Sequence, residues 1–294
     1  MTPLRVLRAA MLSAFAALAM ASPITASADA GQLLARHEQL REQLRDSQFG
    51  RGLHIDSAEQ PDHLQGEVFA VLDHSFATVS EALREPARWC DILILPFNTK
   101  YCHAVDGNGG PALQVRIGRK YDQPVEQAYR LEFALRNVAA RPDYFETRLA
   151  APSGPVGTRD YRIAVAAVPL DGGKRTFLQL SSSYGFGSFG RMAMQAYLST
   201  AGADKVGFTI TGRDADGKPQ FINGVRGAIE RNAMRYYLAI DSYLDAPGNQ
   251  VDKRINHWFS STERYPRQLR EMDRNTYVTM KKAEYERQET AALN

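Results

Sequence analysis

Apolar and polar residues alternate in different rhythms along the first third of this 294-residue chain. Residues 31–47 carry apolar side chains at helical spacing, which predicts a helix with one apolar side formed by Leu33, Leu40 and Leu44. Residues 48–65 are rich in glycine, proline and polar side chains, so the pattern predicts a connector. A strand-like run follows at 67–72, and residues 76–95 predict one or two short helices that break at Pro86.

After Pro96 the rhythm changes to strict alternation, which is typical of half-buried strands. The predicted strands include residues 113–117, 129–136, 144–149, 161–167 and 176–183. Turn-forming residues separate them at 106–110, 141–143, 152–157 and 171–173. Because short connections join only antiparallel neighbours, the pattern predicts an antiparallel meander with one apolar and one wet face.

Helical spacing returns near the end of the chain. Residues 188–200 predict a helix, 205–211 are expected to add a further strand, and 224–244 predict a long helix with one apolar stripe. Residues 250–294 form a charged tail in which aromatic residues recur, so we expect one or two appended helices that pack on the body.

The amino terminus has the features of a cleavable signal peptide. Arg5 and Arg8 precede an apolar run over 11–21, and small residues then offer cleavage after Ala28 or Ala30. We therefore expect export to the periplasm. The predicted organisation is a signal peptide at 1–30, a helix and connector at 31–63, a main domain at 64–246 and a helical tail at 247–294.

Charge and composition exclude several classes of function. The formal net charge of +3 falls to +2 when Arg5, Arg8 and Asp29 are removed with the signal peptide, so nucleic acid is not an expected partner. The exported compartment is poor in nucleotide cofactors, and no cofactor is expected. The six histidines show no metal-ligand spacing and no G-x-S-x-G motif occurs, so no catalytic or metal-binding residue is predicted.

Cys90 and Cys102 are the two cysteines of the chain. Their spacing matches no common zinc pattern, and an oxidising compartment preserves disulfides. We expect a structural disulfide between them; two free thiols or a metal pair are the alternatives.

The order of elements resembles the START-related helix-grip superfamily (SRPBCC-like proteins). The similarity covers roughly residues 64–246 and is carried by the strand at 68–76, the helical stretch with Trp89, the strands over 113–184 and the helix at 224–244. The resemblance implies an α+β fold in which a curved antiparallel sheet wraps a long carboxy-terminal helix around a cavity. Members mostly bind lipids, sterols or other apolar small molecules, and a minority are enzymes. The inserted helix at 188–200 and the long tail depart from the simplest pattern.

Such a cavity would be walled by large side chains of the strands and helices, for which we expect Trp89, Phe133, Tyr161, Tyr184, Tyr236 and Ile240. Small residues on central strands would leave it room, namely Ala134, Ala164, Ala166, Ser181, Ser182 and Ser183. The alternative is that these small residues only admit close packing of the helix.

Polar residues of the long helix are candidates for a head-group contact. Arg231 and Arg235 beside Glu230 would face a carboxylate or phosphate group. The alternative is a surface ion pair between Glu230 and Arg226 or Arg235.

The glycine-rich stretch at 185–190 precedes the inserted helix, and its residues Gly185, Phe186, Gly187 and Phe189 are expected to form a portal loop. It also matches G-x-G-x-x-G formally. The antiparallel strands before it do not favour a dinucleotide site.

The leading hypothesis is a non-enzymatic periplasmic carrier of a hydrophobic small molecule or lipid. One alternative is a hydrolase or isomerase that uses Glu132 or Glu230 for proton transfer in the same cavity. Another is an envelope interaction protein whose tail, with Trp258 and a helix over 264–285, docks a partner or transiently contacts a membrane surface. The carrier hypothesis expects ligand binding to survive deletion of residues 250–294.

Overall fold

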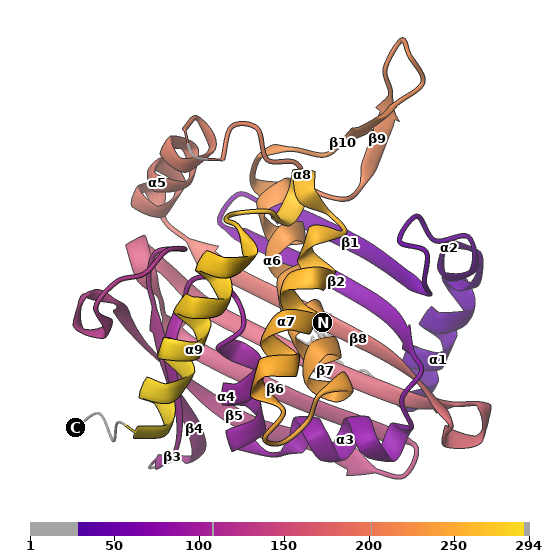
Figure 1. Ribbon diagram of the computed structural model, residues 1–294. Coiled ribbons are helices and arrows are strands. Elements are labelled where there is room, and N and C mark those ends of the chain that lie inside the picture. The colour runs from indigo at the N-terminus through magenta and orange to yellow at the C-terminus, as the bar shows by residue number, and fades with distance from the viewer. Residues whose placement is uncertain (1–28, 108, 201, 291–294) are drawn as a thin grey trace, which may run out of the picture.

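An eight-stranded antiparallel sheet organises the computed structural model, which describes residues 29–107, 109–200 and 202–290 (Figure 1). Its spatial order is β1-β2-β8-β7-β6-β5-β4-β3. The strands are β1 (Leu53–Gln60), β2 (His63–Leu72), β3 (Thr99–Gly107), β4 (Gly110–Ile117), β5 (Tyr129–Arg141), β6 (Tyr144–Ser153), β7 (Thr158–Leu170) and β8 (Arg175–Phe186). The chain crosses from β2 to the far edge through α3 (Phe76–Arg84) and α4 (Pro86–Leu93), then returns by hairpins until β8 pairs with β2. The predicted antiparallel meander is confirmed.

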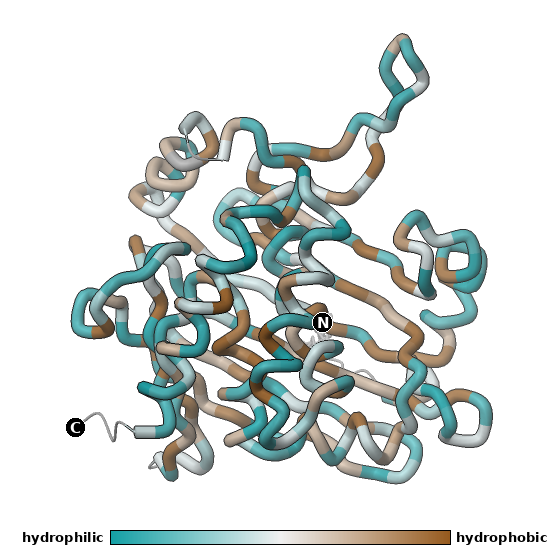
Figure 2. The backbone as a smooth tube through the Cα atoms, viewed as in Figure 1, coloured by the Kyte–Doolittle hydropathy of each residue, from teal (hydrophilic) through white to brown (hydrophobic). Residues whose placement is uncertain are grey.

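The long helix α6 (Gly224–Asp245) packs on one face of this sheet and contacts β1, β2 and β8. Val68 and Ala70 of β2 belong to the core on this side, whereas Phe69 between them belongs to the other side. This is the alternation that a pleated strand imposes, and Figure 2 shows hydrophobic and hydrophilic residues alternating along the strands. The arrangement confirms the predicted α+β fold, in which a curved antiparallel sheet packs around a long helix.

The opposite face of the sheet is covered in part by the amino-terminal helices α1 (Ala30–Gln39) and α2 (Arg41–Arg45). The leucines that predicted an apolar helix side are all buried, and they pack against Phe69, Tyr144, Val168 and Phe177. The face expected to be wet is therefore partly apolar. The predicted signal peptide lies outside the described residues, except for its last two positions.

The predicted connector at 48–65 is wrong, because it contains β1 and the start of β2. Leu53 and Ile55 alternate inward and are almost fully buried, while the last three residues of β1, Ala58 to Gln60, are exposed. An edge strand has no neighbouring strand on one side, so its backbone groups there need other hydrogen-bond partners. Here Arg226 Nη2 donates to the Ser57 carbonyl at 2.9 Å. The polar residues that suggested a connector are those of an edge strand.

A long insertion separates β8 from α6. It holds α5 (Ser188–Leu198), close to the predicted helix, and a two-stranded hairpin, β9 (Ile210–Arg213) and β10 (Pro219–Phe221), which projects from the body with a hydrophilic tip (Figures 1 and 2). The strand predicted at 205–211 is mostly wrong. The backbone amides of Phe208 and Thr209 donate to the buried Glu230 carboxylate instead of to a neighbouring strand.

The tail forms α7 (Val251–Glu263), α8 (Pro266–Leu269) and α9 (Arg274–Thr290), as predicted for helices that pack on the body. Trp258 and Tyr277 are fully buried, and their rings stack with centroids 5.2 Å apart. Trp258 is part of the main core, so its side chain is covered and does not offer a surface to a partner. Among the described helices, none is long and apolar enough to cross a membrane.

A buried charged triad joins α9 to the start of β3. Glu284 Oε1 accepts from Lys100 Nζ at 2.9 Å and Oε2 accepts from Lys281 Nζ at 2.7 Å. Lys281 also donates to the carbonyls of Pro96 and Thr99 at 2.7 and 2.8 Å. Burial lowers the pKa of Lys281 to about 8. The tail helix is thus fixed to the polypeptide that connects α4 to β3.

The predicted disulfide between Cys90 and Cys102 is confirmed. It joins α4 to β3, and both residues are buried in the main core. Two free thiols and a metal pair are thereby excluded for these cysteines.

Replacing both cysteines, as Cys90→Ala with Cys102→Ala, is expected to lower the free energy of unfolding by about 3 kcal/mol. The bridge restricts the unfolded chain across a sequence separation of 12 residues. Urea denaturation of the oxidised proteins measures the effect, and reduction of the wild-type protein should reproduce it. A loss below about 1 kcal/mol would show that the bridge does not restrict the unfolded chain as argued.

Candidate functional site

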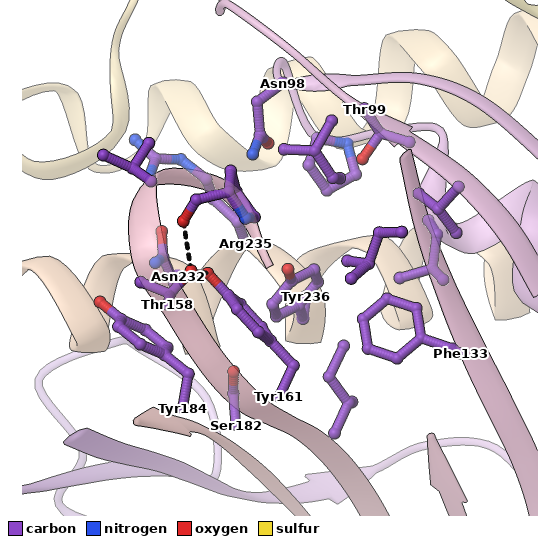
Figure 3. Close-up of a pocket in the computed structure, with 18 of the residues that line it drawn as sticks. Asn98, Thr99, Phe133, Thr158, Tyr161, Ser182, Tyr184, Asn232, Arg235 and Tyr236 are labelled. Carbon is purple, nitrogen blue, oxygen red and sulfur yellow. Dashed lines mark hydrogen bonds between the residues drawn. The ribbon is translucent and has the colours of Figure 1, made fainter. Parts of the chain in front are cut away.

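A cavity of about 310 Å³ lies between the inner face of the sheet and α6 (Figure 3). Strands β4, β5, β7 and β8 form its floor, α6 forms its roof, and the α4–β3 connection closes one side. The volume is at the lower end of the range that small-molecule sites occupy.

One part of the cavity is lined mostly by apolar side chains. Phe133 of β5 is the largest of them, and it lies across the cavity from the α6 residues Asn232 and Arg235 in Figure 3. The others come from α4 and the neighbouring strands: Leu93, Val115, Ile117, Leu131 and Ile163. Removing apolar ligand surface from water here would contribute about 25 cal/mol per Å².

The α6 side of the cavity carries polar groups. Arg235 and Asn232 lie about one helical turn apart and both line the cavity. Arg235 Nη2 donates to Glu271 Oε1 at 2.6 Å, and the same oxygen lies 2.7 Å from Lys120 Nζ. The Arg235 side chain is only 9 % exposed, so the guanidinium is held at the cavity wall.

Three tyrosines add hydroxyl groups to this polar part. The rings of Tyr161 and Tyr184 stack with centroids 5.2 Å apart, and the Tyr161 hydroxyl lies 2.9 Å from Thr158 Oγ1. Burial raises the pKa of Tyr236 to about 12 and also raises the pKa values of Tyr161 and Tyr184. All three therefore stay protonated at neutral pH, when they can donate or accept hydrogen bonds but do not supply a base.

Helix α5 and the 3-10 turn η2 (Pro155–Gly157) line one end of the cavity and contact each other there; we call this end its mouth. Val156, Phe189 and Met192 are 55, 60 and 60 % exposed there. Gly157 has φ +72°, and a side chain on it would meet the Phe189 ring at 3.2 Å. Glycine at 157 thus allows α5 to approach the turn.

Four of the six predicted wall residues line the cavity, namely Phe133, Tyr161, Tyr184 and Tyr236. Trp89 and Ile240 do not line it, although both, like Phe133, are buried in the main core. Trp89 Nε1 donates to the Leu83 carbonyl at 2.8 Å, which fixes the indole between α3 and α4. Helical spacing identified both as buried, but it does not distinguish a cavity wall from packed core.

The expectation about small residues was wrong except at one position. Ser182 lines the cavity, but its neighbours Ser181 and Ser183 point to the other face of the sheet. Ala134 is exposed, and Ala166 belongs to the core under α1. The remaining residue, Ala164, shares the outward register of Ala166 and is also absent from the lining.

Of the predicted head-group residues, Arg235 lines the cavity and Glu230 and Arg231 do not. Glu230 is fully buried, and its Oε2 accepts from the amides of Phe208 and Thr209 at 2.6 and 3.0 Å. Arg231 donates to the Val206 carbonyl at 3.2 Å. The alternative of a surface ion pair is also wrong, since Glu230 is buried and Arg235 pairs with Glu271.

The carboxylates considered for proton transfer lie outside the cavity. Glu132 is exposed on the outer face of β5. The Glu230 carboxylate accepts a hydrogen bond from the Phe208 amide, in the insertion between β8 and α6. No Asp or Glu occurs among the described residues that line the cavity. Within the same described part of the chain, no group of three or more His, Cys, Asp or Glu side chains could hold a metal ion.

The predicted portal loop is displaced by a few residues. Gly185 and Phe186 belong to β8 and pair with Arg159 and Thr158 of β7, so they are strand rather than loop. Gly187 is exposed beside α5, and Phe189 stands at the mouth. The formal dinucleotide motif at 185–190 follows an antiparallel strand and does not form the parallel unit that such a site needs.

Sequence reasoning missed several residues of the site. Asn232 could have been found, because it lies three and four residues before Arg235 and Tyr236 on one helix. Asn98, Val156 and Glu271 carried no such signal, since irregular connections place them.

Comparison with known proteins gives a likeness of fold at low similarity. No protein-family model and no curated protein matches the sequence. A point mutant of Thalictrum flavum norcoclaurine synthase is 13 % identical, covers 51 % of this chain and 90 % of its own, and has a TM-score of 0.34. Ara h 8.0201 is 11 % identical, with 66 % and 98 % covered and a TM-score of 0.34. A protein from Arthrobacter aurescens is 18 % identical, with 66 % and 94 % covered and a TM-score of 0.32. This level of likeness assigns no function to the chain.

Proposed function

We propose that this protein is an exported carrier that binds an apolar or amphipathic small molecule, such as a lipid, in the cavity under α6. The observation that carries the proposal is the division of the cavity into an apolar part around Phe133 and a polar part around Arg235 and Asn232. A ligand with one apolar and one polar end would satisfy both parts, because buried polar groups require hydrogen-bond partners.

The mouth supports entry of an apolar molecule. The exposed side chains of Val156, Phe189 and Met192 give the mouth an apolar rim. Exposed apolar residues on monomeric proteins are usually scattered singly, so a group of them marks a binding surface. These three residues lie beside Gly190, Ala193 and Met194, which line the cavity. Movement of α5 relative to the turn η2 would open the route for the ligand.

Export is the part of the proposal that depends on the sequence. The predicted signal peptide at 1–30 carries it, and the Cys90–Cys102 bridge agrees with an oxidising compartment. Fractionation of cells that produce the full chain tests this part: the mature protein is expected in the periplasmic fraction, with its amino terminus after residue 28 or 30.

Filling the cavity is expected to prevent binding. Ser182→Phe places a ring in the floor of the cavity, so we expect the affinity for a fluorescent fatty acid such as cis-parinaric acid to fall by about tenfold or more. Fluorescence titration measures it, and mass spectrometry of organic extracts from the purified protein should show that a co-purifying ligand is lost.

Ser181→Phe is the matched control. It adds the same ring to the adjacent residue, whose side chain points to the opposite face of β8. Equal affinities of both variants and the wild-type protein would place the ligand outside this cavity. Failure of the wild-type protein to bind or co-purify with any apolar ligand would contradict the carrier function itself.

A further inference from the structure

The polar end of the cavity carries an ion pair between Arg235 of α6 and Glu271 of the tail. One carboxylate oxygen, Glu271 Oε1, lies 2.6 Å from Arg235 Nη2 and 2.7 Å from Lys120 Nζ. The Glu271 side chain is 11 % exposed and that of Arg235 is 9 % exposed. Because Arg235 also lines the cavity, this pair stands between the cavity and the surface.

A third cationic side chain, Lys205, lies near this pair. Burial lowers the pKa of Lys205. The charge of Glu271 acts in the opposite direction, whereas the positive charges of Lys120, Arg235 and Arg231 lower the pKa further. Lys120, Arg235 and Lys205 are thus three cationic side chains close to the Glu271 carboxylate. Like charges gathered in a partly buried place repel one another, so such a cluster attracts anionic groups.

The position of Glu271 in the chain suits exchange with a ligand. It lies in the irregular segment Arg270–Asp273 between α8 and α9, not within a helix. That segment is held by bonds that do not involve the Glu271 carboxylate: Arg270 pairs with Glu263 at 2.6 Å, and Lys205 donates to the Arg270 carbonyl. The side chain can therefore turn away from Arg235 while the backbone of the segment stays in place.

We propose that the cavity takes an amphiphile with an anionic head group, a carboxylate or a phosphate, which binds Arg235 and Lys120 in place of Glu271. Glu271 is then an internal competitor that occupies the anion site of the empty protein. Arginine binds both head groups through charge-assisted hydrogen bonds. This inference rests on the proposed carrier function and specifies its class of ligand.

The test compares charged and uncharged ligands with the same chain. Dissociation constants for hexadecanoic acid, 1-hexadecanol and hexadecyl phosphate are measured by displacement of a neutral fluorescent probe, 1,6-diphenylhexatriene. Glu271→Gln keeps the shape of the side chain and removes its charge, so the acid and the phosphate are expected to bind about tenfold more tightly, with little change for the alcohol. Lys120→Met is expected to weaken the acid and the phosphate several-fold and to leave the alcohol unchanged.

Glu263→Gln is the matched control, because it removes a carboxylate that pairs with Arg270 and not with Arg235. Its affinities should equal those of the wild-type protein.

The anion site is contradicted if Glu271→Gln and Lys120→Met change the affinities for the acid and the alcohol equally, or change neither affinity. The carrier function would still stand in that case. If the wild-type protein binds none of the three ligands, the carrier function itself fails. If Glu271→Gln does not fold, Lys120→Met decides alone, since Lys120 is one third exposed and tolerates replacement. If the affinity of Glu271→Gln rises for only one of the two anionic ligands, that ligand identifies the head group as a carboxylate or as a phosphate.

Discussion

Replacing Glu284 by alanine is expected to lower the free energy of unfolding by about 3–5 kcal/mol. Its carboxylate is fully buried and pairs with Lys100 and Lys281, whose side chains are 0 and 1 % exposed. Without it, two ammonium groups would stay in the core, where the remaining partners within the described residues are backbone carbonyls and the Met280 sulfur. Breaking a buried ion pair by removing one partner is costly because the remaining charge keeps its desolvation penalty.

Equilibrium denaturation in urea at pH 7 measures this loss. Glu286→Ala is the matched control, since Glu286 lies two residues away on the same helix and is exposed. We expect the control to change stability by less than about 0.5 kcal/mol. Similar midpoints for Glu284→Ala and Glu286→Ala would mean that α9 does not depend on the triad for its attachment.

Ending the chain at Asn249 is expected to abolish cooperative folding and ligand binding together. The removed helices supply apolar residues to the main core, among them Ile255, Trp258, Phe259, Leu269, Tyr277 and Met280. Fully burying each large apolar side chain contributes about 1.5–3 kcal/mol, so the sum is as large as the whole stability of a typical domain. This result would be opposite to the expectation from sequence that ligand binding survives the deletion.

Contacts near α6 add to the same effect. Arg254 of α7 is fully buried and donates through Nη1 to the carbonyls of Ala246 at 2.7 Å and Gly248 at 3.1 Å, where α6 ends. Trp258 Nε1 donates to the Arg235 carbonyl at 3.2 Å, directly behind the cavity. The truncated chain would lose these contacts on the helix that forms the cavity roof.

Circular dichroism during heating and fluorescence titration with cis-parinaric acid check the truncation. A chain ending at Lys282 serves as the comparison, because it keeps α7, α8 and half of α9 but lacks Glu284. It should fold with reduced stability. A chain ending at Asn249 that melts cooperatively and binds the probe would show that the tail is an independent appendage.

The sheet and the long helix could be predicted from sequence because each leaves a local pattern. Alternation over 129–136 and 161–167 follows from the pleat of β5 and β7, and the apolar stripe of α6 follows from its turn. Glu230 and Arg235 could be identified as chemically distinctive on α6. Which of them reaches the cavity could not, because both lie on buried parts of the helix surface.

The cavity required the tertiary structure. Trp89 and Phe133 are equally plausible as wall residues by size and spacing, but Trp89 packs between α3 and α4 while Phe133 meets open space. Serines 181 to 183 are identical in type; the pleat turns the middle one away from its neighbours, and the register of β8 with β7 and β2 places that middle serine on the inner face. A residue's direction across a sheet is set by pairing with strands far away in sequence.

By itself, the sequence determined the antiparallel meander, the long helix, the Cys90–Cys102 pair and the helical tail, because period, turn residues and cysteine spacing are local properties. Only the tertiary structure decided where β1 lies, that the tail completes the core, and that Glu271 meets Arg235 across 36 residues of chain. Those facts depend on which distant surfaces pack together, and packing is a property of the whole chain rather than of any segment.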